Sequence, residues 1–297
     1  MDKPLVVGVD GSEPSLQAVD WAADEAALRG APLRLVYASL WEHYEGAALS
    51  PDLGRTSEQI LADRIVEAAG RRARRRRPDV KTDTEVLSDA PVPALVRAAR
   101  TAALLVLGSR GRGGIAELLL GSVSLGVAAH ADCPVIVLRG RHEGTPDFAA
   151  HGRVLLGVGD GRRGSAAVSF AFQEAKRRGA VLEAVRAWRC PARQSTDHPL
   201  LAGEPARLHE QQAVETLEAA VEEAAAQYPA VEVRRRTAEG AARRVLLGAS
   251  ASADLLVVGA RRRGGHFGLQ LGRVAHTALH HSACPVAVVP ATEEHRA

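Results

Sequence analysis

Cysteine is scarce in this chain of 297 residues, and it offers neither a disulfide framework nor a metal-binding pattern. The three cysteines, Cys133, Cys190 and Cys284, are odd in number and form no CxxC pair and no Cys/His spacing. Cys133 and Cys284 each precede Pro-Val at the start of an apolar run, where a small buried hydrophobe fits. This usage predicts a protein of a reducing compartment.

Long apolar segments and aromatic residues are also few. No stretch approaches the roughly 18 consecutive apolar residues of a membrane span, and the first residues, Met-Asp-Lys-Pro, do not begin a signal peptide. Aromatic residues make up 3% of the chain, and 38 basic residues face 35 acidic ones. Neither base stacking nor strong attraction to phosphates is indicated. We expect a soluble, cytoplasmic protein that binds neither a membrane nor nucleic acid.

The motifs of several enzyme classes are missing too. There is no GxxxxGK[ST] loop and no GxSxG turn. The only lysines are Lys3, Lys81 and Lys176, and no residue offers itself as a general base. We therefore expect no catalytic residue and no metal ligand.

What the chain does contain is an internal repeat. Residues 6–11 match 155–160 at an offset of 149, and residues 104–108 match 255–259 at an offset of 151. The repeat predicts two domains of one fold, residues 1–140 and 152–297, joined by a linker at 141–151.

Each half alternates short, continuous apolar runs with helical patterns, as strands buried on both faces require. The sequence therefore predicts an α/β fold: two tandem five-stranded parallel sheets, doubly wound in strand order 3-2-1-4-5, with helices on both faces. Ser12 is the expected cap of the first helix, and Gly30-Ala31-Pro32 is its expected stop. In the first half we expect strands near 5–9, 32–38, 80–87, 103–107 and 134–138, and helices near 13–29, 57–77, 91–101 and 121–130.

A glycine-rich segment follows the fourth strand of the first half. In a sheet of this order, ligands bind beyond the carboxyl ends of strands 1 and 4. We expect Gly108 to allow a turn with positive φ and Gly111 to let the backbone approach an anion. Gly121-Ser122 begins a helix whose first amides favour phosphate, and Ser124 adds a hydroxyl.

Asp10, at the end of the first strand, has two interpretations. Its carboxylate can accept hydrogen bonds from an adenine amino group or a ribose hydroxyl, or meet a metal ion. Alternatively, Asp-Gly-Ser before a helix is a common N-terminal turn. Residue type and position do not separate the two.

These segments together resemble a known family. The run Val7 to Ser12, the motif Gly108-x2-Gly111-x9-Gly121-Ser122 and the run Cys133 to Val137 are similar to the universal stress protein family in its tandem form. The resemblance implies that motif-bearing domains bind ATP, with Mg²⁺ as a candidate companion. Carried over residue by residue, it implies an adenine nucleotide site made of Gly8, Val9, Asp10, Ala38, Leu107, Gly108, Gly111, Gly121, Ser122, Val123 and Ser124.

The second half departs from this motif. Gly159 aligns with Asp10, Arg262 with Gly111, and Arg273 with Ser122. A side chain at the second glycine would obstruct a phosphate, although two arginines could form a different anion site. We expect ATP mainly in the first half.

Three other features of the sequence each have more than one interpretation. The run of arginines from Arg71 to Arg77 could neutralise nucleic acid phosphates, but the end of a helix is the simpler interpretation. The histidines His276, His280 and His281 resemble metal ligands without a carboxylate or cysteine at ligand spacing. The long connection at 39–56 could cover a ligand or be an ordinary loop.

The expected function is that of an ATP-binding regulatory or stress-response protein. A slow ATPase or nucleotidyl-transfer enzyme on the same glycine loop, and an interaction module independent of nucleotide, are the alternatives. The resemblance also implies that the last strands, 134–138 and 285–289, pair as edges between domains or subunits, and the expected assembly is a homodimer formed through these edge strands.

Overall fold

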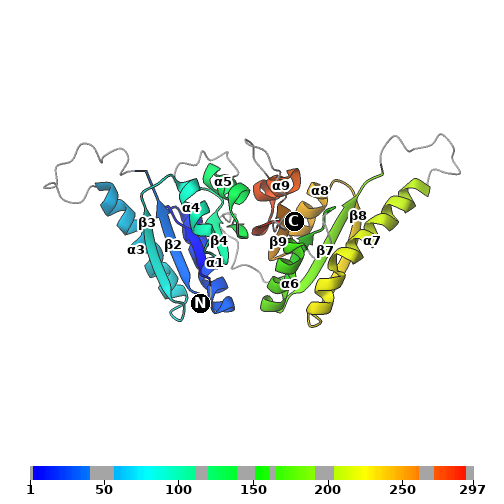
Figure 1. The fold of residues 1–297 in the computed structure, drawn as a ribbon, viewed down its shortest axis with the longest axis horizontal. Coiled ribbons are helices and arrows are strands. Elements are labelled where there is room, and N and C mark those ends of the chain that lie inside the picture. The colour runs from blue at the N-terminus through cyan, green and yellow to red at the C-terminus, as the bar shows by residue number, and fades with distance from the viewer. Residues whose placement is uncertain are drawn as a thin grey trace, which may run out of the picture. The chain divides into compact units, whose positions relative to one another are not determined.

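The computed structural model describes residues 3–40, 57–111, 120–138, 151–160, 165–190, 204–260 and 271–291. These residues form two compact units, one before the expected linker and one after it. Figure 1 shows a parallel sheet with helices on both of its faces in each unit. The units are described one at a time.

The sheet of the first unit has the strand order β3-β2-β1-β4-β5, and every pairing is parallel. Helices α1 and α3 pack together on one face, and α4 and α5 pack together on the other. The elements are β1 (Leu5–Gly8), α1 (Glu13–Arg29), β2 (Leu33–Ala38), α3 (Ser57–Arg76), β3 (Thr82–Leu87), α4 (Pro91–Ala99), β4 (Leu104–Gly108), α5 (Ser122–His130) and β5 (Val135–Leu138).

The second unit repeats this plan with the order β8-β7-β6-β9-β10. Helices α6 and α7 cover one face of its sheet, and α8 and α9 cover the other. The elements are β6 (Arg153–Gly157), α6 (Ala166–Arg178), β7 (Val181–Trp188), α7 (Glu204–Gln227), β8 (Val233–Glu239), α8 (Ala242–Ser250), β9 (Leu255–Ala260), α9 (Arg273–His281) and β10 (Val286–Pro290). The predicted fold class and strand order are confirmed, whereas the proposed domain boundaries stay a prediction.

Local signals place the first helix of each unit. Ser12 caps α1 by accepting a hydrogen bond from the Ser15 amide, and Ser165 caps α6 in the same way from Val168. Gly30 and Gly179 end these helices with φ of 62° and 58°, the left-handed conformation that glycine adopts without strain. The predicted start and stop of the first helix are confirmed.

The parallel register makes the two units comparable position by position. Gly8 pairs with Val36 in the first sheet, and Gly157 pairs with Val185 in the second. Counting onward from these pairs, Asp10 corresponds to Gly159 and Tyr37 corresponds to Arg186. Each position of one unit can therefore serve as an internal comparison for the other.

Candidate nucleotide site

The candidate site lies beyond the carboxyl ends of β1 and β4. These two strands are neighbours in the sheet, but the helix after β1 packs on one face and the helix after β4 packs on the other. Such a reversal leaves a crevice at the strand ends where ligands bind in open α/β sheets. Asp10 follows β1, and Gly108 ends β4, so both chain segments reach this point.

Asp10 forms the turn between β1 and α1. Its Oδ1 accepts hydrogen bonds from the amide of Ser12 at 3.0 Å and from the Ser12 hydroxyl at 2.6 Å. Gly11, between them, has a φ of 80°. The N-terminal turn interpretation of Asp10 is thus realised, and Oδ1 is the oxygen that makes it.

The other oxygen of Asp10 faces the glycine loop. A Cβ built on Gly111 would overlap Asp10 Oδ2. The Ser12 hydroxyl also lies 3.5 Å from the carbonyl oxygen of Arg110. Glycine at 111 therefore lets the loop after β4 close against the carboxylate after β1.

Gly108 is required for a different reason than the sequence indicated. We expected positive φ at Gly108, but it is not among the glycines with positive φ. A Cβ at Gly108 would lie 2.7 Å from the carbonyl carbon and oxygen of Pro14. The first turn of α1 crosses β4 so closely that only glycine fits, so the expectation of positive φ was wrong.

The two serines at the start of α5 differ in their surroundings. Ser124 is buried, and its hydroxyl donates a hydrogen bond of 2.7 Å to the Gly108 carbonyl. This bond fixes the end of β4 to the first turn of α5. Ser122 is exposed, and the cap residue Gly121 offers no side-chain acceptor to the first amides of the helix. Those amides are the groups that favour an anion at a helix start.

The remaining predicted site residues divide between the crevice and the core. Val9 and Leu107 are buried, and a Cβ at Gly8 would lie 2.5 Å from a methyl group of Leu107. Gly8 therefore permits close packing of the neighbouring strands. Ala38 ends β2 and Val123 lies in the first turn of α5, both half-buried.

The equivalent place in the second unit holds a salt bridge. Asp160 Oδ1 lies 2.6 Å from Arg186 Nη2, and Arg186 reaches it from the carboxyl end of β7. Apart from its chain neighbours, no atom of the described residues lies within 4 Å of a Cβ built on Gly159. Arg273 is an exposed residue at the first position of α9, whereas Arg262 lies outside the described residues. The sequence comparison did not identify Arg186, because a single arginine in a strand carries no motif.

Arginines of the run at the end of α3 form hydrogen bonds and salt bridges with aspartates of α1. Arg72 forms two-pronged hydrogen bonds with Asp20, at 2.6 to 3.0 Å, while Arg76 and Arg77 both pair with Asp24 at 2.7 Å. The hydrogen bonds that Arg72 donates to Asp20 raise the pKa of its guanidinium above the usual value, although partial burial opposes them. These pairs join α3 to α1, which favours the helix-end interpretation.

Histidines and cysteines offer no metal site in the described ranges. His276 and His280 stack at 4.5 Å between ring centroids, but no group of three or more His, Cys, Asp or Glu side chains there could hold a metal ion. Burial raises the pKa of the Cys133 thiol to about 12 and that of Cys284 to about 11. Both thiols are buried, as expected for small core residues.

Two further expectations concern membrane-spanning helices and the long connection at 39–56. No helix in the described part of the chain is long and apolar enough to cross a membrane. The long connection at 39–56 lies, apart from Ser39 and Leu40, outside the described residues.

Comparison with known proteins identifies the class to which this fold and site belong. The model of the universal stress protein family matches residues 1–139 and again residues 151–290. A universal stress protein of Mycobacterium bovis is 34% identical over 310 residues, covering 97% of this chain and 99% of that protein. One from Mycolicibacterium smegmatis is 32% identical over 314 residues and covers 96% of each. The chain belongs to the universal stress protein family and carries the family's domain twice.

Solved structures agree on the fold. A universal stress protein from Archaeoglobus fulgidus matches 97% of this chain and 98% of its own, with a TM-score of 0.64 at 17% identity. The matches that cover 46% of this chain include a universal stress protein in complex with cAMP, with a TM-score of 0.35, and one from Archaeoglobus fulgidus in complex with dAMP, at 0.34. Those ligands belong to those proteins, and a ligand for this chain has to be argued from its own residues.

Proposed function

We propose that the first unit binds ATP at the carboxyl ends of β1 and β4, and that the bound nucleotide serves as a regulatory ligand. The observation that carries this proposal is the fit between Asp10 and Gly111. The loop after β4 meets the carboxylate after β1 only because position 111 has no side chain. That arrangement places a hydrogen-bond acceptor beside a glycine backbone, next to a helix start whose cap residue, Gly121, has no side chain.

Each part of this crevice suits a different part of the nucleotide. The Asp10 carboxylate would repel phosphates, so it suits the adenine amino group or the ribose hydroxyls. The first amides of α5 and the exposed Ser122 hydroxyl suit phosphate oxygens. Ser124, which is hydrogen-bonded to Gly108, positions the helix start. If Mg²⁺ accompanies ATP, it would neutralise part of the phosphate charge.

The second unit is proposed to hold no ATP. The position of Asp10 is occupied by Gly159, and the neighbouring Asp160 pairs with Arg186. A nucleotide there would have to compete with this salt bridge. Arg262 at the position of Gly111 would add a side chain where the phosphates approach.

Nucleotide extraction tests the proposal directly. The protein is purified without added nucleotide and denatured, and the released compounds are identified by chromatography and mass spectrometry. We expect ATP, recovered intact. Release of ADP or AMP, accompanied by turnover of added ATP, would favour the slow enzyme. Release of no nucleotide, with no binding of added ATP, would leave the interaction module as the remaining candidate.

The proposal extends to assembly and location. We propose a homodimer formed through the edge strands β5 and β10, whose described residues are almost entirely apolar and buried, and a cytoplasmic location in keeping with the free cysteines. Sedimentation velocity at several concentrations tests the dimer. A strictly monomeric protein at high concentration would contradict it.

A further inference from the structure

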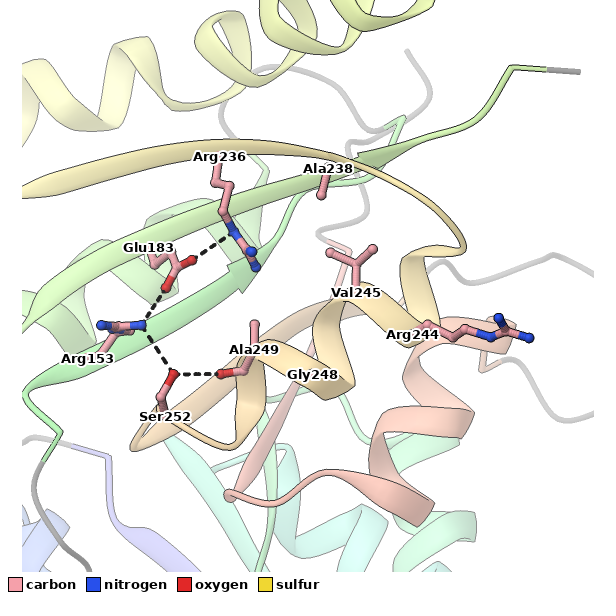
Figure 2. Close-up of a pocket in the computed structure, with 9 residues that line it drawn as sticks. All are labelled: Arg153, Glu183, Arg236, Ala238, Arg244, Val245, Gly248, Ala249 and Ser252. Atoms are coloured by element: carbon pink, nitrogen blue, oxygen red, sulfur yellow. Dashed lines mark hydrogen bonds and ion pairs between the residues drawn. The ribbon is translucent and has the colours of Figure 1, made fainter.

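A cavity of about 390 Å³ lies in the second unit between helix α8 and the strands β6, β7 and β8 (Figure 2). Arg153 begins β6 and Ser252 follows α8, so the charged end of the cavity is near the amino ends of the strands. Asp160 and Gly259, which mark the position of the nucleotide site in this unit, lie at the carboxyl ends. The cavity is therefore separate from the site proposed above.

One carboxylate orients two arginines at this cavity. Glu183 Oε2 lies 3.0 Å from Arg153 Nη1, and Glu183 Oε1 lies 3.0 Å from Arg236 Nε. Arg153 Nη1 also donates to the Ser252 hydroxyl at 3.2 Å. In Figure 2 the Arg236 side chain extends from β8 toward α8, whereas Arg244 is directed away from the other charged groups. Within the described residues, no acceptor pairs with the two Nη atoms of Arg236.

Gly248 keeps the helix wall of the cavity open. It lies inside α8, where glycine is the poorest choice after proline. Outside its own helix backbone and chain neighbours, a Cβ built on Gly248 meets nothing within 4 Å among the described residues, so no packing contact there requires glycine. Its neighbours Val245 and Ala249 also line the cavity and give it an apolar side.

The first unit shows that the fold does not need this arrangement. By register, Glu183 and Arg236 correspond to Arg34 and Glu85, a single pair of reversed sign at 3.9 Å. Pro4 corresponds to Arg153, so the second arginine is missing. Gly248 corresponds to Arg97, which pairs with Asp89. The excess of guanidinium over carboxylate and the missing side chain on the helix are both particular to the second unit.

We propose that this cavity binds a small organic oxyanion, a carboxylate or a phosphate monoester. The guanidinium groups of Arg236 and Arg153 hold the oxyanion, because a guanidinium presents paired donors that match carboxylate and phosphate geometry. The organic part lies against Val245, Gly248 and Ala249. A volume of about 390 Å³ suits a ligand of this size. Glu183 acts as a positioning residue, since each of its oxygens holds one guanidinium in place.

Amide chemical shifts of the full-length, ¹⁵N-labelled protein test this proposal. Benzoate and phenyl phosphate serve as probes, and benzamide serves as the neutral match of benzoate. Because the experiment reports position, a probe in the first unit is recognised by shifts in α5 instead. We expect saturable shifts at Arg236 and Val245–Ser252 with at least one oxyanion and none with benzamide.

Matched variants identify the groups responsible. Arg236→Gln should weaken binding about tenfold or more, because it removes hydrogen bonds to a charged group. Arg235→Gln makes the same charge change on the opposite face of β8 and should change the affinity by less than about twofold. Gly248→Leu should abolish binding by filling the cavity.

Three outcomes would overturn the proposal. They are the lack of saturable shifts with both oxyanions, equal shifts with benzamide, and equal losses in Arg236→Gln and Arg235→Gln. Arg236 is half-exposed, so its variant decides the matter even if Gly248→Leu does not fold. Loss of ATP binding in the first unit would leave this proposal untouched, because the two sites share no residue.

Discussion

At the scale of single residues, Asp10 and Gly111 depend on one another. A Cβ at position 111 would overlap the Asp10 carboxylate, so position 111 can gain a side chain only if that carboxylate moves or is lost. In the second unit both positions differ, with Gly159 and Arg262 in place of Asp10 and Gly111. Where the carboxylate is lost, the steric reason for glycine is lost with it. A sequence comparison shows two separate substitutions, and the contact between Asp10 and Gly111 in the first unit relates the two positions.

Replacement of Gly111 by alanine tests this dependence. The new Cβ would displace the Asp10 carboxylate, and we expect ATP affinity to fall about tenfold or more, equivalent to roughly 1.4 kcal/mol. Isothermal titration of the purified variant measures the loss. Gly159→Ala is the matched control, since the Cβ position there is open, and it should leave ATP binding unchanged. Equal affinities for the two variants would show that the Asp10 contact is irrelevant to the ligand.

The buried cysteines make the protein sensitive to alkali. Burial raises the pKa of Cys133 from 9.0 to about 12 and that of Cys284 to about 11. The folded state thus keeps both thiol protons where the unfolded chain loses them. Their contribution to stability is complete below pH 9 and is lost as pH rises from 9 toward 12.

Urea unfolding between pH 8 and pH 10.5 measures this effect. Each thiol should cost on the order of 2 kcal/mol by pH 10.5. The double variant Cys133→Ala, Cys284→Ala removes both titrating groups and should lose less stability over the same interval. The wild type and the double variant losing stability in parallel would assign the alkaline sensitivity to other groups.

At the scale of elements, helix α8 carries a glycine that its packing does not require. A Cβ at Gly248 meets open space, so Gly248→Ala should stabilise the protein by about 0.5 to 1 kcal/mol through helix propensity. Gly70 in α3 is the matched comparison. A Cβ there would lie 3.2 Å from the Arg74 guanidinium and 3.3 Å from a Thr84 methyl group. Gly70→Ala should gain less or lose stability.

Thermal and urea unfolding of the two variants provide the measurement. A larger gain for Gly70→Ala than for Gly248→Ala would mean that the open space beside α8 is not what the structure indicates. The Gly248 variant also separates stability from binding. Alanine is a better helix former than glycine but does not fill the cavity as leucine would. Its effect on stability can therefore be measured separately from any loss of ligand binding.

At the scale of the whole molecule, the two units share one fold but differ in the residues at the carboxyl ends of their first and fourth strands. Both units have the strand order that puts a crevice beyond their first and fourth strands. The first unit places Asp10, Gly111 and an uncapped helix start there, whereas the second places the Asp160 and Arg186 salt bridge. The charge arrangement beneath α4 and α8 has changed as well. The two proposals above therefore assign a different ligand to each unit.

Titration of the full chain with ATP tests this asymmetry. We expect one ATP per chain, because only the first unit retains the carboxylate and the glycine. Gly111→Arg, which copies the residue at 262, should remove that single site and leave far-ultraviolet circular dichroism unchanged. Two equivalent sites per chain would contradict the asymmetry. A site that survives Gly111→Arg would place the nucleotide elsewhere.

Sequence alone determined the architecture of this protein. Apolar runs of strand length alternate with helical patterns, and Ser12 and Gly30 mark helix ends through interactions within a few residues. Such signals involve residues that are close together in the chain, so they can be recognised from the sequence alone. The repeat added the number of domains, and the strand order was that of the usual doubly wound sheet built from such a βαβ series. The motif also indicated where a ligand would bind.

Only the tertiary structure decided what the individual residues of the site do. Gly108 makes room for the backbone of α1, and Ser124 holds the end of β4. Arg186 meets Asp160 from a neighbouring strand, and Glu183 joins arginines from two other strands. All of these contacts connect segments that are far apart in the chain. Periodicity and spacing report which face a residue occupies, but not which distant group it meets there.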